Sequence, residues 1–220
     1  MKILAIEFSC ELRSVAVVES ATAGFAPLGH ASERGGRHTR GVGMINAALD
    51  QAKLRPESVD CLAVGIGPGS YTGIRAAIAL AQGWQLARPV NLLGISSLDA
   101  MAHQLWREGT YGKMNLAVDA QRNEFYLAAY DISATGFKEI ELLRLTSLEE
   151  IIAKLSTGEP VVGHGLPQGV TGARELFPDA TDLAQLACTR ADFQEDQEEL
   201  APIYLRETTF VKAPPPRIVL

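Results

Sequence analysis

Short apolar runs separated by polar turns fill the first part of the chain, and this pattern predicts strands. The runs cover residues 3–6, 14–18 and 26–32, and Ala23-Gly24 suits the turn between the last two. Three strands in quick succession predict an antiparallel meander or a set of hairpins at the start of the fold.

A helical period follows the strand pattern. Apolar residues recur at i, i+3, i+7 and i+10, at Val42, Ile45, Leu49 and Ala52. This spacing places them on one face of a helix over about residues 38–54, which Pro56 ends.

The middle of the chain alternates strands with helices. The pattern predicts a strand at 61–66, a helix at 74–87, a strand at 90–93 and a helix at 96–106. A strand, a helix and a further strand in this order form a βαβ unit, so part of the sheet is predicted to be parallel.

The same order of elements starts again near residue 110. Strands are predicted at 113–119, 125–130 and 140–145, followed by a helix at 147–155 and a strand at 160–163. Two halves with the same order predict an α/β protein with two lobes. We place the first lobe at residues 1–108, the second at 109–206 and a Pro-rich tail at 207–220.

Charge and composition exclude several classes of function. The net charge of −6 and the isoelectric point of about 5.3 argue against strong RNA binding by the chain alone. The three cysteines lie far apart, which argues against a disulfide framework or a zinc site and favours the reducing cytoplasm. No apolar run approaches the ~18 residues of a membrane span.

Residues 67–75, with the sequence GPGSYTGIR, lie between a predicted buried strand and a predicted helix. A phosphate can meet backbone N–H groups at such a place. However, no Lys-Ser or Lys-Thr pair follows, and the glycine spacing differs from the dinucleotide fingerprint. Two interpretations stay open: weak nucleotide binding at Gly67 and Gly69, or a tight turn in which glycine permits close backbone approach.

An acidic residue, Glu7, ends the first predicted strand. Two-lobed kinases and ATPases place an acid there to hold magnesium and phosphate, so Glu7 and Ser9 are candidate nucleotide ligands. Glu11 adds a second carboxylate that would repel a phosphate unless a cation intervened. We therefore expect a site that is degenerate for phosphoryl transfer, and keep an active ATPase or phosphotransferase as the alternative function.

The histidines do not form a metal site by spacing. His38 opens the first helix, and a helical pair of metal ligands would need a second histidine at position 42, which is Val42. We predict no metal, no cofactor and no catalytic residue.

The two helices of the first half carry more apolar and small residues than one core face needs. Helix 74–87 is rich in alanine and contains Gly83, which costs about 1 kcal/mol relative to alanine inside a helix and so suggests close packing. Apolar surface beyond the needs of the core often marks an interface. The predicted partner contacts are His38, Val42, Ile45, Leu49, Arg75, Ala76, Ile78, Ala79 and Gln82.

Five segments together resemble one known family. They are residues 3–9, 67–75, 94–102, 119–122 and 202–206, and they occur in the same order as in the TsaB (YeaZ) family. The resemblance implies an actin-like (ASKHA, ribonuclease H-like) two-lobed α/β fold with mixed sheets and flanking helices. The chain departs from the usual family pattern at Glu7-Phe8, where Asp-Thr is commoner.

The resemblance also implies a function. Members of this family are non-catalytic scaffold subunits for the formation of N6-threonylcarbamoyladenosine at position 37 of tRNA. TsaD, which is related in fold, transfers the threonylcarbamoyl group. The TsaB-like protein binds TsaD through its own first-lobe helices, and TsaE joins the complex. The resemblance thus implies a cytoplasmic protein that forms a heterodimer with TsaD, contacts tRNA indirectly, and forms a homodimer when alone.

Overall fold

The computed structural model describes residues 1–21, 24–35, 40–190 and 200–205. The elements, in chain order, are β1 (Lys2–Glu7), β2 (Leu12–Ala21), β3 (Gly24–Arg34), α1 (Gly41–Ala52), a 3-10 turn η1 (Pro56–Ser58), β4 (Cys61–Gly65), α2 (Tyr71–Ala87), β5 (Asn91–Ile95), α3 (Ser97–Arg107), β6 (Gly112–Asp119), β7 (Glu124–Ser133), β8 (Gly136–Ser147), α4 (Leu148–Ser156), β9 (Val161–His164), β10 (Arg174–Glu175) and α5 (Ala180–Thr189).

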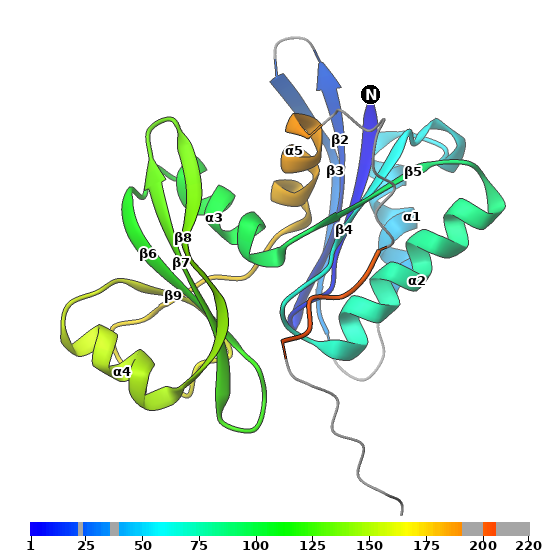
Figure 1. Ribbon diagram of the computed structural model, residues 1–220. Coiled ribbons are helices and arrows are strands. Elements are labelled where there is room, and N and C mark those ends of the chain that lie inside the picture. Colours follow the sequence, from blue (N-terminus) through cyan, green and yellow to red (C-terminus); the bar gives the residue numbers. More distant parts are fainter. Residues whose placement is uncertain (22–23, 36–39, 191–199, 206–220) are drawn as a thin grey trace, which may run out of the picture.

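Two mixed sheets form the two lobes (Figure 1). The first has the order β3-β2-β1-β4-β5, and the second has the order β10-β9-β6-β7-β8. In the first sheet β1 pairs antiparallel with β2 and parallel with β4, and in the second β6 pairs antiparallel with β7 and parallel with β9. The predicted antiparallel start, the parallel βαβ unit and the two-lobed α/β fold are confirmed.

Helices cover both faces of each sheet. Along β1, Leu4 and Ile6 pack on the side of α1 and α2, whereas Ile3 and Ala5 pack on the side of α5. All four side chains are fully buried, which explains the continuous apolar run in the sequence. In the second sheet one face packs on α3 and the other on α4.

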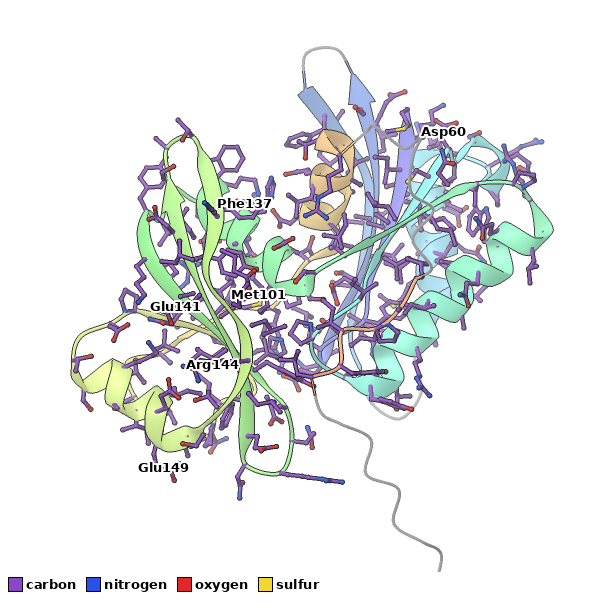
Figure 2. All side chains as sticks on the ribbon, viewed as in Figure 1. Asp60, Met101, Phe137, Glu141, Arg144 and Glu149 are labelled. Atoms are coloured by element: carbon purple, nitrogen blue, oxygen red, sulfur yellow. The ribbon has the colours of Figure 1, made fainter. Side chains whose placement is uncertain are left out.

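Helices α3 and α5 lie between the two sheets (Figure 1). Met101 of α3 packs into the core of the second sheet, and Phe137 of β8 contacts both that core and the core around α5 (Figure 2). The packing therefore crosses the proposed lobe limits, because α3 belongs to range 1–108 and α5 to range 109–206. Those limits follow the repeat in the sequence and stay a proposal.

A buried polar cluster joins α3 to α5. Asp182 is fully buried and accepts hydrogen bonds from His103 Nδ1 at 2.7 Å and from the Nε and Nη2 atoms of Arg107, both at 3.2 Å. The two helices between the sheets are thus tied by a charge-assisted contact as well as by apolar packing.

The last described segment returns to the first lobe, where the Ile203 N–H donates to the Ile66 carbonyl at 2.9 Å. The predicted tail at 207–220 lies outside the described residues. None of the described helices is long and apolar enough to cross a lipid bilayer.

Candidate functional site

The glycine-rich turn before α2 is packed tightly against the loop after β1. A Cβ at Gly69 would come 2.2 Å from the Ser9 carbonyl oxygen, and a Cβ at Gly73 would come 1.9 Å from that of Phe8. Gly67 and Gly69 also have φ values of +94° and +147°, which side chains rarely adopt. Close approach thus explains these glycines by packing, and a nucleotide role for Gly67 and Gly69 stays a prediction.

The Glu7 carboxylate is directed into the protein. It is fully buried and accepts hydrogen bonds from the Ser9 N–H at 2.6 Å and from the Ser97 hydroxyl at 2.8 Å. Burial raises its pKa. Glu7 thus ties the end of β1 to the start of α3, which corrects its placement as a nucleotide ligand, whereas Ser9 does line the cleft described below.

An apolar groove of about 470 Å³ lies between α1 and α2, and we call it the α1–α2 groove. It is lined by Phe8, Arg40, Gly41, Val42, Gly43, Ala76, Ala79 and Leu80. Val42 is 60% exposed, although it is a large apolar residue. Small residues on both helices leave this hollow open, because they carry no side chain that would fill it.

The predicted partner contacts divide into two sets. Val42, Arg75, Ala79 and Gln82 are exposed and Ala76 is half-buried, so these side chains are accessible. By contrast Ile45, Leu49 and Ile78 are only 5%, 3% and 7% exposed and belong to the core of the first lobe. We remove these three from the predicted contact surface, because the apolar period selects the face that packs on the chain's own sheet. His38 lies outside the described residues.

A larger cleft of about 970 Å³ opens between the two lobes, and we call it the interlobe cleft. Its walls come from the loop after β1, the start of α2, the turn between β6 and β7, and the ends of β9 and β10. At its rim Tyr71 stacks on Tyr204 with ring centroids 5.2 Å apart, and the Arg75 guanidinium lies 4.0 Å from the Tyr71 ring. The sequence did not predict this cleft, because its walls are far apart along the chain.

His164 lies in the wall of this cleft and is 7% exposed. Burial lowers its pKa from about 6.5 to about 4. The folded protein therefore holds the imidazole neutral, whereas the unfolded chain takes up a proton below about pH 6.5. This contribution to stability is complete above that pH and is lost as the pH falls toward 4.

We expect the free energy of unfolding to fall by about 2 kcal/mol between about pH 7 and pH 5 through His164 alone. Urea titrations of the wild type and of His164→Gln at both pH values measure it, since the variant lacks this group but keeps all others. An equal fall in both proteins would show that His164 is not the group responsible.

The surroundings of Cys10 and Cys61 in the first lobe make their thiols unreactive. Burial raises the pKa of Cys10 strongly and that of Cys61 to about 12, so both remain protonated and weakly nucleophilic. Within the described ranges, no group of three or more His, Cys, Asp or Glu residues is placed to hold a metal ion.

The two mixed sheets, with helices around and between them, define a two-lobed α/β protein of the actin-like class. The family model described as "TsaD: tRNA N6-adenosine threonylcarbamoyltransferase" matches residues 32–179. The solved structure "YeaZ from Pseudomonas aeruginosa" has a TM-score of 0.73 and 27% identity, and the match covers 93% of this chain and 99% of that one.

Two curated relatives that match over nearly the whole chain carry the same name. The "tRNA threonylcarbamoyladenosine biosynthesis protein TsaB" of Escherichia coli K12 is 30% identical, over 98% of this chain and 99% of the relative. The protein of the same name from Haemophilus influenzae is 28% identical, over 97% and 98% of the two chains. The chain belongs to the TsaB (YeaZ) family.

Proposed function

We propose that this chain is a non-catalytic partner subunit that enables a TsaD-type transferase to form N6-threonylcarbamoyladenosine at position 37 of tRNA. The observation that carries the proposal is the α1–α2 groove, an apolar hollow with Val42 exposed at its side. The names of the relatives supply the pathway.

We choose a TsaD-type protein as the occupant of the α1–α2 groove because the two partners are alike. This chain matches the TsaD family model over residues 32–179, which include both α1 and α2. Proteins that share a fold can associate through the same surface patch on each subunit, as the two halves of a twofold dimer do. A TsaD-type protein is thus the partner that the α1–α2 groove fits best.

The same surface supports a homodimer when the partner is absent, which would then compete with the heterodimer. We propose TsaE as a third component and tRNA as an indirect partner through the complex, in the cytoplasm. The buried Glu7 carboxylate and the protonated thiols of Cys10 and Cys61 support a subunit that performs no chemistry itself.

Light scattering on a sizing column tests this proposal, with the protein alone and then mixed with TsaD from the same organism. We expect a stable heterodimer that forms as the homodimer disappears. If the two proteins stay separate at micromolar concentrations, the scaffold function is wrong.

The alternative is an ATPase or phosphotransferase of the same architecture. The volume of the interlobe cleft and the presence of Ser9 and Gly69 in its wall favour it. Saturable ATP turnover by the pure protein would support this alternative over the scaffold.

A further inference from the structure

Arg13 is a buried cation, and two of its three guanidinium nitrogens have no partner among the described residues. This first-lobe residue of β2 is 8% exposed, and its Nε and Nη1 atoms make no hydrogen bond to the part of the chain that the structure describes. The guanidinium packs closely on Gly35, where a Cβ would come 2.7 Å from Cζ. An unpaired ion in a protein interior is strongly unfavourable, so a buried guanidinium of this kind calls for an anion.

A second polar group of the interlobe cleft shares this property. His164 is 7% exposed, and its Nε2 atom has no hydrogen-bond partner among the described residues. Arg13 lines the cleft from the first lobe, and His164 lines it from the second. Buried polar atoms are almost always hydrogen-bonded, so unpartnered atoms on both walls of one cleft indicate a missing ligand.

We propose that the interlobe cleft binds the anionic oxygens of a small molecule, a phosphate or a carboxylate group, on the guanidinium of Arg13. The planar guanidinium offers parallel N–H donors that match two oxygens of such a group. The His164 imidazole on the opposite wall can donate one further hydrogen bond to the ligand. This site is separate from the α1–α2 groove and does not depend on the partner proposed for that groove.

The other charges of the cleft limit the charge of the ligand. Its walls also carry Arg122 and the carboxylates of Glu11, Asp119 and Glu175, and Glu11 pairs with Arg34 at 2.9 Å. Several carboxylates repel a ligand with many negative charges, so a group with one or two charges fits better than a polyphosphate. The volume of about 970 Å³ leaves room for a metabolite attached to that group.

Thermal unfolding in sodium phosphate and in sodium acetate tests the site, with sodium chloride holding the ionic strength constant. We expect the melting temperature of the wild type to rise with one or both anions. Arg13→Met should bind the anion about 10- to 100-fold more weakly, because it loses hydrogen bonds to a charged group. Without anion it should unfold no earlier than the wild type, because the unpaired buried charge is gone.

Arg55→Met is the matched control. It removes the same charge at an exposed side chain that is not part of the cleft wall. We expect it to respond to the anions like the wild type. A response to phosphate alone identifies a phosphate group as the natural ligand, and a response to acetate alone identifies a carboxylate.

No response in the wild type, or the same response in all three proteins, would overturn the proposal. If Arg13→Met does not fold, His164→Phe decides, because it keeps the ring stacked on Phe177 and removes only the unpartnered nitrogen from the cleft. We expect a severalfold weaker response in His164→Phe, and an unchanged response would overturn the placement of the anion.

Discussion

Replacing Asp182 with alanine is expected to lower the free energy of unfolding by about 2–4 kcal/mol. The carboxylate is fully buried between α3 and α5 and accepts three hydrogen bonds from His103 and Arg107. Its removal leaves His103, which is 5% exposed, without a hydrogen-bond partner for Nδ1. Arg107 is about half exposed and can turn to water, which keeps the loss below that of a fully buried pair.

Urea denaturation followed by circular dichroism at about pH 7 measures this loss, with Asp50→Ala as the matched control. Asp50 is also a helical aspartate, but it lies exposed on α1, so its replacement should change the stability by no more than about 0.5 kcal/mol. If the two variants prove equally stable, the cluster around Asp182 does not hold α3 to α5.

Most strands and helices were predictable because their signal is local. The apolar runs of β1 and β4 and the helical period of α1 are properties of short segments, and the structure confirms them. Helix α5 was not located in the sequence. It packs on the first sheet and on α3, and its buried residues include the polar Asp182 and Gln185. Polar residues on the buried side interrupt the apolar pattern by which a helix is recognised. The one local signal was Asp179, whose carboxylate caps the helix through the Thr181 N–H at 2.7 Å.

Candidate sites were harder to predict than elements, because burial depends on tertiary packing. Val42, Ile45 and Leu49 share one apolar stripe in the sequence, yet Val42 is 60% exposed and the other two lie in the core. The apolar period of a helix shows which of its faces is apolar. It does not show where the sheet beneath that face ends. The interlobe cleft shows the same limit, since Arg13 and His164 both line it although they are far apart along the chain.

Val42→Glu is expected to weaken the complex with TsaD by about 30-fold or more, the loss typical of a central apolar contact. The substitution places a charge at the side of the α1–α2 groove, where a partner would have to desolvate it. The fold itself should be unaffected to within about 0.5 kcal/mol, because the side chain is 60% exposed in the isolated protein. A glutamate in the first turn of α1 also suits the positive end of the helix dipole.

Two variants on the same helix separate interface from core. Ile45→Glu buries an unpaired charge at a position that is 5% exposed, so we expect it to lose more than about 4 kcal/mol and to unfold. Ala47→Glu changes an exposed residue outside the groove and should bind TsaD like the wild type. Titration calorimetry with TsaD and urea denaturation give both quantities for each variant. If Val42→Glu binds TsaD as tightly as Ala47→Glu does, the partner occupies a surface other than the α1–α2 groove.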